Sequence, residues 1–405
     1  MNAFTCEPCS PKSGRSRALN LDFTPEQIEF RDKVRDWLAG NIPAEQRPPD
    51  GAEGREFDLA WQKTLYAGGW AGINWPKEYG GQGFDTFQQL IFLMEYSRAG
   101  APGDHYRFNG LNLAGPTIIA CGDEEQKSTY LPPILKGEVI WCQGFSEPSA
   151  GSDLAALKTR GVIDGDDLVV TGSKIWTSWA RFADWQQVLV RTDPDAPKHK
   201  GISWLINRMD NPGMEIRPIH DMAGGSDLHE VFYDEVRIPL KNVVGGLNNG
   251  WKVSMAQLSF ERGTAFMPSQ IETQKTIEDL IELAKVTRLE DGRLAIDDDH
   301  IAYQLARLRA ETRSLLAMTL LGISRNERSG MPGPEGSMLK LFQSELYKRI
   351  MALALDIVGN DRAKLSGLTA RWPQGFLGSF ANTLGGGTSE VMRNIIGERH
   401  LGLPR

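Results

Sequence analysis

The residues of this chain with the clearest capacity for chemistry lie in two short segments near its middle. Residues 141–153 (WCQGFSEPSAGSD) form an apolar run that breaks into a loop of small side chains. Small side chains let backbone N–H groups and hydroxyls converge on one bound anion or polar heterocycle. Residues 172–178 (GSKIWTS) close a second apolar run with Trp176, whose ring could lie against a flat ligand. The two segments predict a site for a planar, phosphate-bearing cofactor, although turns of this kind and a core tryptophan would look the same in sequence.

A candidate general base lies on a predicted helix in the C-terminal part of the chain. Trp251, Met255, Leu258 and Ala265 recur at helical intervals, and Glu261 falls in the same apolar stripe. A carboxylate in such a stripe would be partly desolvated, which raises its pKa as a general base requires. The alternative interpretation is a surface carboxylate held in a local ion pair.

Three stretches of different periodicity must position these residues. Residues 1–20 contain few apolar side chains and predict a disordered leader. Residues 21–138 are mostly of helical period, residues 139–244 are short β-rich runs separated by turns, and residues 245–405 return to long helical patterns. The predicted fold class is therefore α+β: an N-terminal helical domain, a central β-barrel-like or sandwich domain, and a C-terminal four-helix bundle.

Local signals predict individual elements within these stretches. Thr24 followed by Pro25 gives an N-cap and a proline at the first helical position, so we expect a helix that ends near Gly40. A second helix is predicted over residues 58–67. Residues 164–167 (DGDD) lie between two β-rich runs and predict a hairpin.

Composition and charge narrow the class of protein. The formal net charge is −7, and without an overall basic face we expect no nucleic-acid partner. No apolar run approaches the ~20 residues that span a bilayer, and the N-terminus lacks the apolar core of a secretory signal, so we expect a cytoplasmic protein with no membrane partner. Cys6 and Cys9 lie in the polar leader without two further ligands nearby, so we expect no metal site.

The segments that carry the chemistry also resemble a known family. GFSEPSAGSD followed by GSKIWTS looks like the flavin signature of the acyl-CoA dehydrogenases, whose usual form is close to TEPGAGSD and then a Trp-Ile-Thr segment. The likeness extends through most of the chain to its end, GGGTSEVMRNIIGERHLGLPR. It implies an FAD-dependent enzyme: a carboxylate removes the α proton of an acyl-CoA thioester while a hydride leaves the β carbon for the flavin N5. An electron-transfer flavoprotein would then accept the electrons.

The resemblance also implies which residues contact the cofactor. The expected FAD contacts are Gln143, Ser146, Gly151, Ser152, Trp176, Ser178, Gly387, Thr388 and Glu390. Trp176 would stack beside the isoalloxazine ring, and Ser152 would also lie near the thioester arm of the substrate. Arg262 matches a substrate-side arginine of the family, with a counter-ion between helices as the alternative interpretation.

The base of the medium-chain type of the family is missing from its usual place. That carboxylate precedes a Gly-Thr pair, and here the residue before Gly387 is Gly386, which has no side chain to act as a base. The long-chain and isovaleryl types carry a Glu-Arg pair on the first long C-terminal helix, and Glu261 with Arg262 is similar to that pair. Glu390 is the rival base, although its place in the motif favours a cofactor contact.

The family resemblance further implies how the thioester oxygen is held. The backbone N–H before the Gly-Thr pair, here that of Gly386, would donate to the developing enolate oxygen together with a ribityl hydroxyl of the cofactor. The run of three glycines at residues 385–387 also removes side-chain bulk. We therefore expect a wide acyl pocket, as in members that act on bulky or branched chains such as those of steroid breakdown.

Two further functions remain open. Many relatives carry an Arg-x-x-Phe-Gly stretch that reaches the FAD of a neighbouring subunit, and residues 284–303 lack it. The chain could therefore be a non-catalytic or half-site subunit of a heteromeric dehydrogenase. Alternatively, oxygen could replace the flavoprotein acceptor, which would make the protein an acyl-CoA oxidase or monooxygenase. The sequence does not distinguish a homo-oligomer, dimer or tetramer, from a two-plus-two heterotetramer, nor does it give the length and shape of the acyl group.

Overall fold

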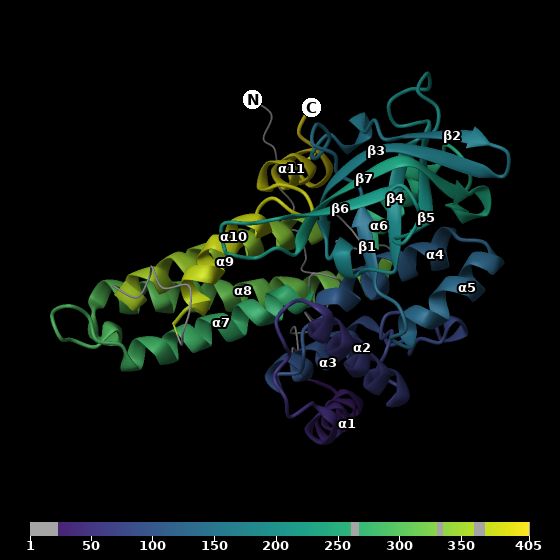
Figure 1. The fold of residues 1–405 in the computed structure, drawn as a ribbon. Helices are drawn as coiled ribbons and strands as arrows, with labels where there is room; N and C mark the ends of the chain where they lie inside the picture. Colours follow the sequence, from purple (N-terminus) through teal and green to yellow (C-terminus); the bar gives the residue numbers. More distant parts are fainter. Residues whose placement is uncertain (1–22, 261–266, 330–334, 360–368, 405) are drawn as a thin grey trace, which may run out of the picture.

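The protein consists of a helical part, a β part and a second helical part, which follow one another along the chain (Figure 1). A computed structural model describes residues 23–260, 267–329, 335–359 and 369–404. The predicted leader, residues 1–20, lies outside these ranges, as do Glu261 and Arg262. The predicted α+β architecture is confirmed, while the exact domain boundaries stay predictions.

The N-terminal part is built from five α-helices, drawn in purple to blue in Figure 1. Their bounds are α1 Pro25–Asn41, α2 Ala52–Ala67, α3 Thr86–Arg98, α4 Gly115–Cys121 and α5 Glu124–Leu135. Thr24 caps α1 through a capping box with Gln27, as the predicted N-cap requires. Helix α2 begins six residues before its predicted start at residue 58. Gly54 explains the difference, because a Cβ there would lie 2.7 Å from the Pro49 carbonyl oxygen, so this glycine serves close packing and does not break the helix.

The middle part is one eight-stranded sheet in the order β6-β7-β3-β2-β4-β5-β8, with β1 paired to β4 in parallel. Its strands are β1 Trp141–Gly144, β2 Arg160–Asp164, β3 Asp167–Ser178, β4 Trp185–Arg191, β5 Ile202–Arg208, β6 Met214–Ile219, β7 Leu228–Pro239 and β8 Val243–Val244. The predicted hairpin is confirmed, since Asp164 pairs with Asp167 and Gly165 has φ +62°. A single residue pair, Arg160 with Arg191, joins β2 to β4.

That narrow junction lets the two halves of the sheet pack face to face. Buried side chains from β3 and β7, such as Val170 and Val231, share one core with Cys142 of β1 and Val188 of β4. The opposite face of β1, β4 and β5 packs on the N-terminal helices through Trp141, Leu189 and Trp204, among others. The sheet is therefore covered on both sides of β1 and β4, which holds the ends of these strands rigidly.

In the described ranges of the C-terminal part there are six α-helices, drawn in green to yellow in Figure 1. Their bounds are α6 Gly250–Phe260, α7 Met267–Val286, α8 Asp299–Ser329, α9 Glu335–Val358, α10 Arg371–Asn382 and α11 Ser389–Ile395. Helices α7, α8, α9 and α10 run alongside one another and enclose a core that includes Leu280, Leu315, Leu346 and Trp372. Helix α7 also packs on α3 of the N-terminal part.

In the ranges that the structure describes, no helix combines the length and apolar character needed to cross a bilayer.

Candidate active site

The loop after β1 carries most of the small side chains of the predicted cofactor site. Its turn is closed by reciprocal backbone hydrogen bonds between Glu147 and Ala150, with N···O distances of 3.1 and 3.0 Å. Gly151 and Ser152 follow this turn and are exposed. A Cβ at Gly151 would meet no atom within 4 Å. Because this glycine is not needed for packing inside the chain, the space beside it is available to a ligand.

The two predicted cofactor segments lie side by side in the structure. The backbone N–H of Ile175 donates to the carbonyl oxygen of Ser146 at 2.9 Å. The Lys174 ammonium donates to the carbonyl oxygen of Phe145 at 3.1 Å. The fold thus brings together, through backbone contacts, two segments that are separated by about twenty residues in the sequence.

A buried ion pair between Lys174 and Glu147 holds this junction. Lys174 is 0% exposed, and its Nζ lies 2.8 Å from Glu147 Oε1. The Glu147 carboxylate also accepts the backbone N–H groups of Lys158, at 2.7 Å, and Thr159, at 2.8 Å. The carboxylate is therefore satisfied by three donors, and the pair fixes both ends of the loop that carries Ser146, Gly151 and Ser152.

The two members of this pair respond differently to burial. Burial opposes the negative charge of Glu147, but Lys174 and the backbone donors outweigh it and lower the Glu147 pKa. Burial also opposes the positive charge of Lys174, and here it exceeds the attraction of Glu147, so the Lys174 pKa falls to about 8. The lowered Glu147 pKa and its three donors indicate a carboxylate that stays ionised at neutral pH.

Strand β3 presents Trp176 outward through an irregular backbone. Trp176 has φ +60°, which is uncommon for a residue with a side chain, and its ring is 55% exposed. The pairing of β3 with β7 shifts register between Lys174 and Thr177, as at a bulge. Bulges often redirect a side chain beside an active site, and here the exposed aromatic ring suits a flat ligand.

Buried polar atoms without a partner support a cofactor at this junction. Gln143 Nε2 and Thr177 Oγ1 are both buried and find no hydrogen-bond partner within the described residues. Buried polar groups in proteins are nearly always satisfied, so such atoms call for a ligand or a water molecule. The polar edge of a flavin ring offers the donors and acceptors that an amide and a hydroxyl would need. The residues present therefore fit a flavin.

The glycine run near the C-terminus adopts a conformation that requires glycine. Gly386 has φ +66° and Gly387 φ +101°, in the left-handed region that side chains disfavour. Lys340 of α9 donates through Nζ to the Gly387 carbonyl oxygen at 2.6 Å. Thr388 then caps α11, its hydroxyl accepting the Val391 N–H at 3.2 Å. These contacts orient the backbone around the Gly386 N–H.

The environment of Glu390 lowers its pKa, which argues against the role of general base that the sequence left open for it. A hydrogen bond from its own backbone N–H, followed by one from Thr388, lowers its pKa. Its side chain is exposed and lies 3.4 Å from Arg393. A general base for this chemistry needs the opposite, a carboxylate whose proton affinity is raised by a dry environment.

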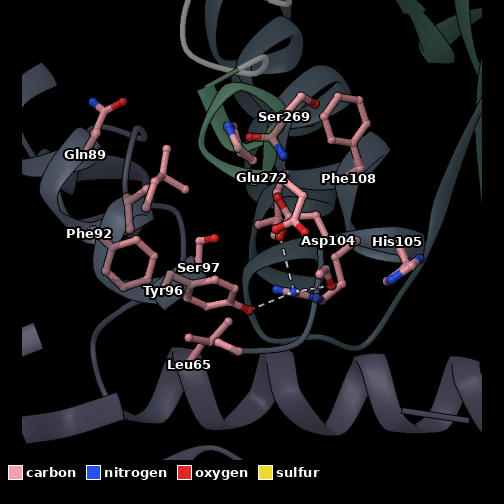
Figure 2. A pocket seen from close by; sticks show the side chains of 18 of the residues that line it. Leu65, Gln89, Phe92, Tyr96, Ser97, Asp104, His105, Phe108, Ser269 and Glu272 are labelled. Carbon is pink, nitrogen blue, oxygen red and sulfur yellow. Dashed lines mark hydrogen bonds and ion pairs between the residues drawn. The ribbon is translucent and has the colours of Figure 1, made fainter. Parts of the chain in front are cut away.

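A cavity of about 640 Å³ lies between the N-terminal helices and helices α7 and α9 (Figure 2). Pro268 and Ser269, at the start of α7, line it directly after the segment that contains Glu261. Asn382, which ends α10 four residues before Gly386, lines it as well. Two described segments that neighbour the predicted catalytic residues in the sequence, the start of α7 and the end of α10, therefore line this cavity.

The cavity and the predicted cofactor residues are distinct parts of the structure. None of Gln143, Ser146, Ser152, Trp176 and Ser178 is among the residues that line the cavity. The two parts are connected by the short π-helical segment Asn109–Ala114, since its Leu111 lines the cavity while its Gly110 packs against Trp141 of β1. One wall of the cavity thus rests on the strand that leads into the cofactor loop.

Comparison with known proteins decides the family. The model of the acyl-CoA dehydrogenase N-terminal domain matches residues 24–138, that of the middle domain residues 142–236, and that of the C-terminal domain residues 248–401. The chain belongs to the acyl-CoA dehydrogenase family. This membership, expected from the two cofactor segments and the C-terminal motif, is confirmed, and with it the class of flavin-dependent oxidoreductases.

Similar members of the acyl-CoA dehydrogenase family point to the steroid type. Acyl-CoA dehydrogenase IpdE1 from Mycobacterium tuberculosis is 38% identical over 385 residues, covering 93% of this chain and 98% of that relative. The ChsE4-ChsE5 complex from the same organism contains a chain with 36% identity and a TM-score of 0.82, covering 96% of this chain and 100% of its own. The Tcur3481-Tcur3483 steroid ACAD matches at 33% identity and a TM-score of 0.83, with coverages of 96% and 100%.

Sequence analysis assigned no role to Lys174 and Glu147, which the structure shows as a buried ion pair at this junction. A signal was present in the strand pattern: Leu168, Val170 and Lys174 are spaced by even numbers along β3, and all three are 0% exposed. A lysine on the inward face of a strand needs an acidic partner, and Glu147 lies in the loop that this strand supports. The roles predicted for the other site residues remain predictions.

Proposed function

We propose that this acyl-CoA dehydrogenase oxidises a bulky acyl-CoA thioester to its 2-enoyl-CoA, with FAD as cofactor and Glu261 as base. The observation that carries the proposal is the cavity bounded by the start of α7 and the end of α10. Its volume of about 640 Å³ is within the range of small-molecule sites. The glycine run at residues 385–387 follows Asn382 of the lining by three residues and carries no side chain, which would suit an acyl group broader than a straight chain.

The loop after β1 and the end of β3 would hold the cofactor. FAD, when bound, supplies the hydride acceptor and a ribityl hydroxyl. Gln143 and Ser178 would bind its polar edge, together with the hydroxyl of Ser146, while the Trp176 ring would cover its flat face. The remaining predicted contacts, Gly151, Ser152, Gly387, Thr388 and Glu390, would hold the rest of the cofactor. The ion pair of Lys174 with Glu147 keeps these segments in place.

The chain's own residues would manage the proton and the developing charge. Glu261 would take the α proton, and the Gly386 N–H would donate to the thioester oxygen as negative charge accumulates there. The left-handed backbone at Gly386 and the contact between Lys340 and the Gly387 carbonyl support a fixed direction for that N–H. Arg262 and Ser152 would contact the thioester side of the substrate.

A half-site subunit of a heteromer is the second candidate function. One similar structure is described as the ChsE4-ChsE5 complex. In this chain, residues 284–303 expose two large side chains, Val286 at the end of α7 and Tyr303 in α8. Exposed apolar side chains in the region that lacks the family's inter-subunit stretch support an interface with another subunit. An electron-transfer flavoprotein would be the acceptor in either case, and peroxide formation during turnover would indicate an oxidase instead.

The proposal is tested by Glu261→Gln, with Glu390→Gln as the matched control. Glu261→Gln removes the proton acceptor at nearly constant volume, so we expect a loss of about 10²- to 10⁴-fold in kcat with FAD still bound. Glu390→Gln should weaken FAD binding as a lost cofactor contact but, measured at saturating FAD, should keep kcat within about threefold, because the lowered pKa of Glu390 argues against its being the base. Stopped-flow reduction of the flavin measures both variants. Full activity in Glu261→Gln would contradict the assignment of the base.

A further inference from the structure

We propose that His229 of β7 is a positioning residue that turns Trp176 of β3 outward, where its ring can lie against the cofactor. The inference rests on the proposed function in one respect, since it takes Trp176 as the residue that covers the flat face of FAD. His229 is a buried histidine that belongs neither to the predicted cofactor contacts nor to the predicted catalytic residues.

Two buried side chains of β3 are spaced in a way that a regular strand does not allow. Lys174 and Thr177 are both 0% exposed. Side chains in a regular strand alternate between its two faces, so residues three positions apart lie on opposite faces. Burial of both residues on one face therefore requires an extra residue between them.

The pairing of β3 with β7 contains this extra residue. Lys174 lies opposite Val231, and Thr177 lies opposite His229. Three steps along β3 thus face two steps along β7, which is the count of a β-bulge. Trp176 lies inside the bulge with φ +60°, and its ring is 55% exposed. The outward direction of Trp176 therefore depends on holding both Lys174 and Thr177 on the buried face.

Each end of the bulge is held by a buried side chain. On one side, the ammonium group of Lys174 lies 2.8 Å from the carboxylate of Glu147. On the other side, Nδ1 of His229 lies 3.2 Å from the carbonyl oxygen of Thr177. Because a carbonyl oxygen can only accept, Nδ1 carries the hydrogen and donates it. His229 is 1% exposed, so this hydrogen bond is shielded from water.

The bulge needs the N–H group of His229 and does not need a positive charge. Burial lowers the pKa of His229 more than the hydrogen bond to the Thr177 carbonyl raises it, so the ring stays neutral at pH 7. An asparagine side chain also carries an N–H group on the atom bonded to Cγ, whereas a leucine side chain offers similar bulk without a donor. These two replacements form a matched pair for a test.

Loss of the donor should act on Trp176 and leave the sheet in place. A left-handed backbone at a residue with a side chain persists only where its surroundings hold it. A regular strand that continued from Lys174 would place residue 176 on the buried face, two positions further on. Beyond the bulge, the N–H of Trp179 donates to the carbonyl oxygen of Asp227 at 2.6 Å, which keeps the end of β3 beside β7.

The first test reads the position of the Trp176 ring in the apoprotein, without any cofactor. Incorporated 5-fluorotryptophan gives a ¹⁹F signal for each of the eleven tryptophans, and the Trp176 signal is the one that disappears in Trp176→Phe. We expect His229→Leu to change the chemical shift of this signal and to reduce its H₂O–D₂O solvent shift, which measures exposure of the ring. His229→Asn should keep both values, as should His300→Leu, a control at an exposed histidine of α8. His229→Met replaces His229→Leu if the leucine variant does not fold.

The second test measures FAD affinity by titration of the apoprotein. His229→Leu should weaken binding by about three- to tenfold, no more than loss of the Trp176 ring itself. Because the two residues act in series, His229→Leu should add less than about twofold when Trp176→Ala is already present. His229→Asn should bind FAD within about twofold of wild type.

The outcomes separate the inference from the proposed function. An unchanged Trp176 signal in His229→Leu, or an equal change in His229→Asn, would overturn the inference. Additive losses of FAD affinity from His229→Leu and Trp176→Ala would overturn it as well, since they indicate a purely structural role for His229. If the Trp176 signal responds as expected but neither variant changes FAD affinity, the proposed contact of Trp176 with FAD fails while the positioning by His229 stands.

Discussion

The predicted cofactor junction and the cavity between the N-terminal helices and helices α7 and α9 differ in how their polar groups are paired. At the junction, the ionised groups are already paired: Lys174 and Glu147 satisfy each other and the backbone of the loop. In the cavity, Tyr347 and Glu272 keep their hydrogen-bonding capacity unused among the residues that the structure describes. At the junction, the chain itself pairs the charged groups and leaves the neutral atoms Gln143 Nε2 and Thr177 Oγ1 for a ligand. In the cavity, by contrast, a carboxylate and a phenol are left. Such a division lets the same cofactor frame serve different substrates.

The largest expected effect is on the free energy of unfolding, when Lys174 of the cofactor junction is replaced. Lys174→Met leaves the Glu147 carboxylate buried without its main counter-charge, so we expect the free energy of unfolding to fall by about 3–5 kcal/mol. The double variant Lys174→Met with Glu147→Gln removes both charges and should recover at least half of that loss. Urea denaturation monitored by tryptophan fluorescence measures both. A loss below about 1 kcal/mol in the single variant would show that the pair does not fix the junction.

The same lysine predicts a dependence on pH with a definite sign. The folded pKa of Lys174, about 8, lies below the ordinary lysine pKa of 10.5. Between these two pH values the unfolded chain therefore binds the proton that the folded chain has lost. The free energy of unfolding of wild type should therefore rise with pH relative to that of Lys174→Met, by at most about 1.4 kcal/mol per pH unit. Denaturation of both proteins at pH 7.5, 8.5 and 9.5 checks this. A difference that shrinks as the pH rises would contradict the assigned direction.

A smaller effect is expected at the exposed ring beside the junction. Trp176→Ala should weaken FAD binding by about tenfold, which corresponds to the loss of an aromatic contact of about 1.4 kcal/mol. Stability should change little, because the ring is 55% exposed. Titration of the apoprotein with FAD measures the affinity, and Tyr303→Ala, another exposed aromatic position, is the control. Unchanged FAD affinity would mean that Trp176 does not touch the cofactor.

The contrast between the two regions also explains what could be predicted from sequence. The cofactor segments are contiguous runs, so their small residues and Trp176 could be recognised by composition and by resemblance. The succession of a helical part, a β part and a second helical part follows from the spacing of apolar residues, which changes from a helical to a β period near residue 139. The β2-β3 hairpin is equally local, since residues 164–167 carry its turn.

The features that escaped prediction depend on contacts between distant residues. The start of α2 depends on the approach of Pro49 to Gly54, and the φ of +60° at Trp176 depends on the irregular pairing of β3 with β7. The cavity brings together side chains from α3, α7 and α9, such as Phe92, Glu272 and Tyr347, which no short-range pattern relates. Lys174 could have been identified from its inward position in the strand.

The measurement that tests the account most directly is the visible spectrum of the purified chain, before and after anaerobic addition of acyl-CoA thioesters. We predict a stoichiometric flavin spectrum that bleaches with bulky ring-bearing thioesters and hardly changes with straight chains of the same carbon number. A colourless protein that neither binds added FAD nor bleaches it with any thioester would contradict the account, and would favour a half-site subunit that requires a partner chain.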